Sequence, residues 1–203
     1  MQYPALILFT LASSITPGPN NTLILASGVN HGVKKSLPHF LGICVGFPLM
    51  VIAVGFGAGT VFKQLPILQI GLKIIGVCYL LYLAYKVATA PTKKMESENK
   101  KPFTFVQAAL FQWVNPKAWI MAIGAVVTFS SVSGNYLVEV ISIAMIFVLF
   151  GAPCTGLWLL FGASLKNLLS NPIRLRLFNI AMAALLVVSL APVIRELCVR
   201  YIA

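Results

Sequence analysis

The first long apolar run, residues 4–29, is interrupted near its middle by Ser13-Ser14-Ile15-Thr16-Pro17-Gly18-Pro19-Asn20-Asn21. Two prolines and a glycine cannot continue an undisturbed helix. Neither flanking stretch can cross a bilayer alone, because a membrane-spanning helix needs about 20 apolar residues. The sequence therefore predicts one membrane-spanning helix that is broken near the middle of the membrane.

The rest of the chain has the composition of a membrane protein. Of its 203 residues, 59% are hydrophobic and 9% are charged, whereas soluble domains carry about 25% charged residues. The apolar runs are continuous rather than alternating, which favours helices over a β-barrel. We therefore predict an all-α, polytopic membrane protein with six transmembrane helices, at residues 4–29, 39–62, 66–88, 103–129, 137–164 and 177–201.

The net charge of +11 is distributed as in membrane proteins and does not form a nucleic-acid-binding surface. One side of the predicted bundle carries ten positive residues: Lys34, Lys35, Lys86, Lys93, Lys94, Lys100, Lys101, Lys166, Arg174 and Arg176. The other side carries four: Lys63, Lys73, Arg195 and Arg200. Because positive loops stay in the cytoplasm, this predicts a cytoplasmic linker, 93–102, and two periplasmic termini.

A second break is predicted in the fourth span, at Gln112-Trp113-Val114-Asn115-Pro116-Lys117. The linker divides the single domain, 1–203, into halves 1–92 and 103–203, and the two breaks occupy matching positions in them. Interrupted spans at matching positions are typical of a transporter site, and two three-span halves must insert as inverted repeats. Two ordinary proline kinks are the alternative. The second and fifth spans echo each other through Gly46-Phe47-Pro48 and Gly151-Ala152-Pro153.

Lys117 is the ionisable residue that the sequence places near the midplane, where a charge costs at least about 2.5 kcal/mol. At the start of a half-helix, its ammonium would attract a substrate carboxylate. The alternative is a structural lysine that binds the carbonyls freed by Pro17 and Pro116, or that extends to the membrane edge. The spans carry no deep carboxylate, so neutral acceptors would hold a substrate ammonium. The candidate substrate-binding residues are Ser13, Ser14, Thr16, Pro17, Gly18, Pro19, Asn20, Asn21, Gln112, Asn115, Pro116 and Lys117.

Other distinctive side chains fit structural roles. The four cysteines, Cys44, Cys78, Cys154 and Cys198, have irregular spacing that matches no disulfide or metal pattern. We therefore expect no catalytic residue, metal or cofactor, and no enzyme. His31 and His39 are expected at the membrane interface. Tyr79 and Tyr82 are expected in helix packing, with cavity lining as the alternative. The pair Gly42 and Gly46 predicts close helix packing inside the monomer, or alternatively a homodimer contact.

Three stretches resemble motifs of the RhtB/LysE family of bacterial amino-acid exporters. They are Thr16-Pro17-Gly18-Pro19-Asn20, the segment 76–86 (GVCYLLYLAYK) and the segment 110–119 (LFQWVNPKAW). The resemblance implies six helices, an inner-membrane location, and amino-acid efflux by antiport with protons. It also implies that Pro17 to Asn20 and Asn115 to Lys117 line the transport path.

Two details of the sequence bear on the cargo and on the branch of the family that the chain resembles. Some family members carry Asp after a glycine in the second helix, whereas Phe47 follows Gly46 here, which argues against basic amino acids as cargo. Asn20-Asn21, His31-Gly32 and the segment 86–92 (KVATAPT) resemble the cysteine/O-acetylserine exporter branch. Homoserine, threonine and other neutral amino acids stay open as cargo. The competing functions are a passive channel or assembly subunit, and a transmembrane thiol redox carrier.

Overall fold

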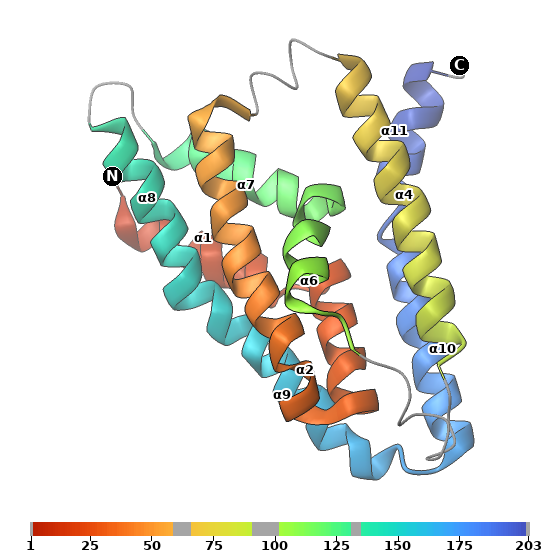
Figure 1. The fold of residues 1–203 in the computed structure, drawn as a ribbon. Coiled ribbons are helices and arrows are strands. Elements are labelled where there is room, and N and C mark those ends of the chain that lie inside the picture. The colour runs from red at the N-terminus through yellow and green to blue at the C-terminus, as the bar shows by residue number, and fades with distance from the viewer. Residues whose placement is uncertain (1, 59–65, 91–101, 131–134, 202–203) are drawn as a thin grey trace.

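The computed structural model describes residues 2–58, 66–90, 102–130 and 135–201, and every regular element in these ranges is helical (Figure 1). The elements are α1 (Tyr3–Ile15), α2 (Pro19–Ala53), η1 (Val54–Ala58), α4 (Pro66–Ala88), α6 (Phe105–Phe111), η2 (Gln112–Val114), α7 (Pro116–Phe129), α8 (Tyr136–Ile146), η3 (Phe147–Gly151), α9 (Ala152–Leu168), α10 (Pro172–Val188) and α11 (Ala191–Tyr201). The all-α prediction is confirmed.

Three of the described helical stretches are long and apolar enough to cross a membrane: Pro19–Gly57, Tyr136–Lys166 and Pro172–Arg195. Shorter apolar helices stand at Tyr3–Ile15, Ile74–Ala88, Phe105–Val114 and Pro116–Phe129. Three of these shorter pieces belong to the two helices that the sequence predicts to be broken, and Ile74–Ala88 is part of α4. The number of six spans therefore depends on how the pieces combine.

Both predicted helix breaks are present. The helix α1 ends at Ile15 and α2 begins at Pro19, so residues 16–18 separate them. The helix α6 ends at Phe111, a 3₁₀ turn follows, and α7 begins at Pro116. In Figure 1, α1 and α7 both run obliquely to the long helices α4 and α10. The breaks thus change the direction of the chain inside the bundle.

The interval between the first two predicted spans, residues 30–38, is helical apart from one residue. The helix α2 continues to Ala53, and the chain reverses at the single residue Gly32, with φ 77° and ψ 175°. This conformation is essentially restricted to glycine. The first two spans are therefore joined by a one-residue reversal, and the polar residues around it are helical.

The fifth and sixth spans also differ from prediction. A π-helical turn, η3, separates α8 from α9 and directly precedes Pro153, whose missing N–H cannot join the helical ladder. The sixth span begins at Pro172 rather than 177, and it divides between α10 and α11 after Val188. The bounds of α4 agree with the predicted third span, 66–88.

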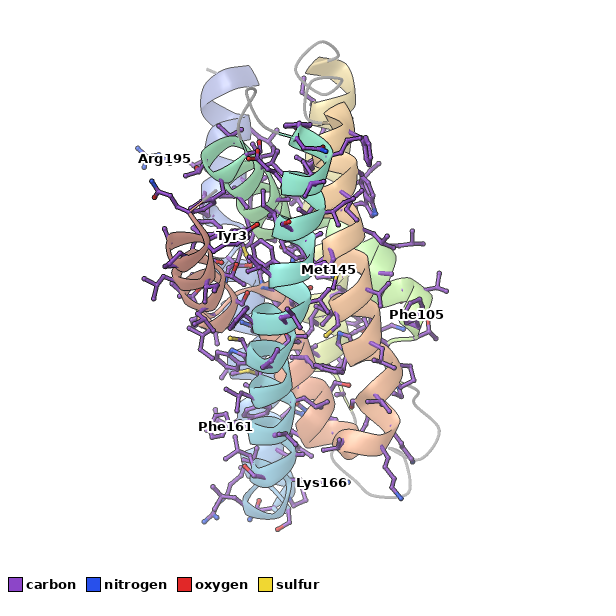
Figure 2. All side chains as sticks on the ribbon, turned by 90° about the vertical axis from the view of Figure 1, so that its left-hand side faces the viewer. Tyr3, Phe105, Met145, Phe161, Lys166 and Arg195 are labelled. Atoms are coloured by element: carbon purple, nitrogen blue, oxygen red, sulfur yellow. The ribbon has the colours of Figure 1, made fainter. Side chains whose placement is uncertain are left out.

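The surface is apolar and the interior contains polar side chains. Leu8, Ile120 and Val127 are each more than 60% exposed. Figure 2 shows Met145 and Phe161 projecting from α8 and α9, and both are about half exposed. The buried polar side chains are Thr10, Asn21, Thr22, Ser27, Ser36, His39, Gln112, Asn115, Thr155 and Asn179. This distribution suits a lipid-facing surface and a polar interior.

Glycines allow the closest helix contacts. A Cβ atom on Gly28 would lie 2.5 Å from the backbone oxygen of Leu159 on α9. A Cβ atom on Gly46 would lie 2.6 Å from Cα of Ala109 on α6, and Gly42 contacts the same helix. The predicted Gly42–Gly46 pair therefore supports close packing inside the chain.

Candidate substrate site

The first helix break is extended backbone. Thr16 has φ −67° and ψ 145°, and Gly18 has φ 179° and ψ 176°. Both precede a proline, which disfavours the helical conformation of the residue before it. Pro19 then occupies the first turn of α2, where a missing N–H costs nothing. Two successive prolines thus hold the first break open and leave carbonyl oxygens outside the helical ladder.

The second break is held by one proline and one amide cap. Asn115 is extended, with φ −85° and ψ 109°, and it precedes Pro116. Its Oδ1 accepts a hydrogen bond from the backbone N–H of Lys117 at 3.1 Å, so Asn115 is the N-cap of α7. The sequence therefore begins a new helix here, with Lys117 in its first turn.

The lysine of the second break binds the first break. The Nζ atom of Lys117 donates to the backbone oxygen of Thr16 at 2.8 Å, to its Oγ1 at 2.9 Å, and to the backbone oxygen of Pro17 at 3.3 Å. Lys117 is half-buried. A Cβ atom on Gly18 would lie 2.6 Å from Cδ of Lys117, so the absence of a side chain there makes room for the lysine.

An amide pair joins the same two breaks. Nδ2 of Asn20 donates to Oε1 of Gln112 at 2.8 Å, and Nε2 of Gln112 donates to Oδ1 of Asn20 at 3.2 Å. Gln112 is fully buried and also donates to the backbone oxygen of Ala108 at 2.9 Å. This reciprocal pair satisfies both amides, as burial requires.

Asn21 satisfies the carbonyls at the end of α1. Its Nδ2 donates to the backbone oxygens of Ser14 and Thr16, at 2.7 Å and 2.9 Å. The hydroxyls of Ser13 and Thr16 donate to backbone oxygens three residues earlier, at Thr10 and Ser13. The first break is therefore a group of acceptors that is bound mainly by side-chain amides and by Lys117.

A small cavity of about 50 Å³ lies at the breaks. It has room for a few water molecules, since each needs about 10–15 Å³, and is too small for an amino acid. Seven of the predicted residues line it: Ser13, Ser14, Gly18, Asn20, Asn21, Asn115 and Lys117. The other five predicted residues, Thr16, Pro17, Pro19, Gln112 and Pro116, lie in the breaks without lining it.

Residues of the second and fifth spans complete the cavity, and the sequence-based site did not include them. They are Ile43, Cys44, Phe47, Pro48, Phe147, Gly151, Ala152 and Thr155, with Ala118 and Met121 from α7. The matching Gly-Phe-Pro and Gly-Ala-Pro stretches were the signal that could have found them. Phe47 packs edge-on against Phe147, with ring centres 4.8 Å apart, so an aromatic wall stands where some exporters carry Asp.

Three aromatic and imidazole side chains line a second, larger cavity: His39, Tyr79 and Tyr82. His39 is 2% exposed, and its ring stacks on Phe103 at 5.0 Å. For the two tyrosines this is the alternative to a role in helix packing alone. The sequence signal for this cavity was the presence of polar side chains within apolar helices, because a buried polar group needs a hydrogen-bond partner or a cavity.

Comparison with known proteins identifies the family. The LysE type translocator model matches residues 11–194. The chain belongs to the LysE type translocator family. This translocator is therefore a multi-pass membrane protein and not an enzyme. No solved structure gives a significant match.

Relatives of this translocator share its length. The cysteine/O-acetylserine efflux proteins of Escherichia coli (strain K12) and Shigella sonnei (strain Ss046) are each 30% identical to it over 182 residues. The matched region covers 88% of this translocator and 90% of each relative. The match to the family model, residues 11–194, spans both helix breaks.

Proposed function

We propose that this translocator exports a small neutral amino acid, or a derivative of one, by antiport with protons. The contact of Lys117 with Thr16 and Pro17 across the two breaks is the observation that carries this proposal. The lysine ammonium occupies carbonyl oxygens that a substrate ammonium would also bind. When the breaks separate, these acceptors and the Lys117 cation become available together, which suits a zwitterion with one group of each charge.

The proposed architecture has six spans in two inverted halves. The first half, 1–92, combines α1 with α2 up to Gly32, then the rest of α2, then α4. The second half, 103–203, combines α6 with α7, then α8 with α9, then α10 with α11. Each half begins with a helix that is broken before a proline. Three spans per half require opposite insertion, which supports alternating access around the breaks.

The proposed location is the bacterial inner membrane, with linker 93–102 in the cytoplasm and both termini in the periplasm. The reversal within α2 and the turn between α9 and α10 lie at one end of the bundle in Figure 1. Figure 2 places Lys166 at this end and Arg195 toward the other. Because Lys166 belongs to the ten positive residues predicted on one side and Arg195 to the four on the other, their positions support this orientation.

The cargo class follows from charge. No acidic side chain lines the small cavity among the described residues, and Phe47 supplies an aromatic wall. A cationic side chain would gain no counter-charge there, which favours a neutral cargo. The named relatives act on cysteine and O-acetylserine, so these two amino acids are the first candidates.

A passive channel or an assembly subunit is the competing function. Inside-out vesicles containing the protein should accumulate labelled O-acetylserine, serine or threonine against its gradient, and a protonophore should abolish the accumulation. Cells that overproduce the protein should survive toxic levels of the same amino acid. Downhill movement that ignores the protonophore would establish a channel.

The thiol carrier alternative has no support at the breaks. Cys44, Cys78 and Cys154 are free thiols, and Cys154 donates to its own helix at the backbone oxygen of Phe150. Cys44 is the one described cysteine that lines the small cavity at the breaks, and thiol exchange there would need a second. Replacement of all four cysteines should therefore leave accumulation in the vesicles intact.

A further inference from the structure

A second, larger cavity lies about one helical turn from the first along α2. It has a volume of about 560 Å³ and is enclosed by α2 near Gly32, by α4, and by the segment that leads into α6. Asn20 lines the small cavity and Leu23, three residues later, lines the large one. Ligand pockets for small molecules have volumes of about 300–1,000 Å³, so an amino acid and several waters would fit.

His39, one of the residues that line this cavity, carries a buried polar atom without a partner among the described residues. The imidazole lines the cavity and is 2% exposed, and its ring stacks on Phe103 with the planes 29° apart. Its Nδ1 atom has no hydrogen-bond partner within the described part of the chain. A buried polar atom without a partner costs about 1–3 kcal/mol. The stacked ring thus holds a nitrogen in place for a partner that the described residues do not supply.

The remaining polar groups of the cavity are neutral or cationic. Asn30, Gln107 and the two tyrosines Tyr79 and Tyr82 line it, and none of its described lining residues is acidic. Asn30 is held by Asn179, to which it donates at 3.1 Å.

Two basic groups complete the electrostatics of the cavity. Lys86 lies at the edge, 5.2 Å from the ring centre of Tyr82. His31 also lines the cavity, near the ammonium groups of Lys35 and Lys166. Such a lining suits a solute with a carboxylate and hydrogen-bonding groups and does not favour a cation.

We propose that this cavity is an entry chamber that binds the amino-acid cargo at the linker end, before the cargo passes between the two helix breaks. His39 is the residue that completes it, through a hydrogen bond from its Nδ1 side to the cargo. This inference rests on the proposed export function. It adds a second binding place, separate from the breaks, and a residue that determines how tightly the cargo is held there.

Water access to the chamber is tested by thiol labelling. Val87 lines the cavity and is half-buried, so Val87→Cys should react with a hydrophilic maleimide added from the linker side. Leu81→Cys, on the apolar surface of the same helix, is the matched control and should react slowly. Labelling is measured by mass spectrometry, which distinguishes the introduced cysteine from the native ones, so the native cysteines need not be replaced.

Protection then tests the cargo. O-acetylserine, serine or threonine, offered in turn, should slow the labelling of Val87→Cys at least about threefold. If Val87→Cys reacts as slowly as Leu81→Cys, or if none of the transported amino acids protects it, the chamber proposal is overturned. Labelling needs no transport, so rapid labelling of Val87→Cys without any accumulation would refute the export function and leave a water-filled chamber.

Variants of His39 test its role as a binding residue. His39→Phe keeps a ring for stacking on Phe103 and removes the nitrogen, so the KM for uptake into inside-out vesicles should rise about tenfold, with kcat changed less than about twofold. His39→Asn places an amide near the position of Nδ1 and should restore the KM to within about threefold. A wild-type KM in His39→Phe, or an Asn variant as weak as the Phe variant, would overturn the assignment.

Discussion

The two helix breaks interrupt their helices with the same kind of residue and present opposite chemistry. The first exposes acceptors, at the carbonyls of Thr16 and Pro17, whereas the second supplies a donor cation, Lys117. The first is held by two prolines, and the second by Pro116 together with the cap of Asn115. Each break is therefore incomplete alone, and the groups that satisfy one come in large part from the other.

This complementarity explains how polar backbone persists inside an apolar bundle. An unpaired polar group in lipid costs several kcal/mol, so both breaks must find partners within the protein. Lys117 and the Asn20–Gln112 pair provide these partners across 90 or more residues of sequence. Any movement that separates the breaks must replace these bonds, with water or with cargo.

Removal of the Lys117 ammonium should cause the largest loss of transport among the substitutions at the two breaks. Lys117→Ala leaves the acceptors of the first break without their donor, and hydrogen bonds to a charged group are worth about 1.5–3 kcal/mol each. We expect accumulation in vesicles to fall at least about a hundredfold, with insertion into the membrane unchanged. Lys34→Ala, at an exposed position near Gly32, is the control and should transport normally. Full activity of Lys117→Ala would contradict the proposed role.

Crowding the lysine should have the next largest effect. Gly18→Ala adds a methyl group 2.6 Å from Cδ of Lys117, and the flexible side chain must move away. Since displacement by about 1 Å can cost up to about a hundredfold in rate, we expect a loss of about tenfold with normal expression. Gly124→Ala is the matched control, because Gly124 lies in α7 and its added methyl group would be 3.8 Å from the ring of Phe9, an ordinary contact distance. Equal activity of the two variants would show that the position of Lys117 is unimportant.

Replacement of the prolines should reduce uptake less, and the two losses show how strongly each break depends on its prolines. Pro116→Ala removes the one proline that keeps Asn115 extended, so the second break can close toward a helix, and uptake should fall about fivefold. Pro17→Ala leaves Pro19 to hold the first break, so uptake should fall about twofold. Initial rates of uptake at equal protein levels measure both. A larger loss in Pro17→Ala than in Pro116→Ala would reverse this ranking of the two breaks.

The chain alone determined where the helices break. Proline restricts its own backbone and that of the preceding residue, so Thr16, Gly18 and Asn115 were bound to be extended whatever surrounded them. Apolar composition likewise determined the helical class and a lipid-facing surface. These are local properties of the chain or properties of its solvent, and they need no knowledge of the tertiary contacts.

Only the tertiary structure decided what the breaks and the buried polar groups contact. The sequence offered a bond from Lys117 to carbonyls freed at the prolines only as an alternative to substrate binding, and the structure shows such a bond, to Thr16. The sequence could not show that Gln112 pairs with Asn20, or that His39 is buried against Phe103 beside a large cavity. The one-residue reversal at Gly32 was also missed, because a glycine among polar residues is equally compatible with a loop. Each of these features depends on which helices become neighbours, and that is settled by packing between segments distant in the chain.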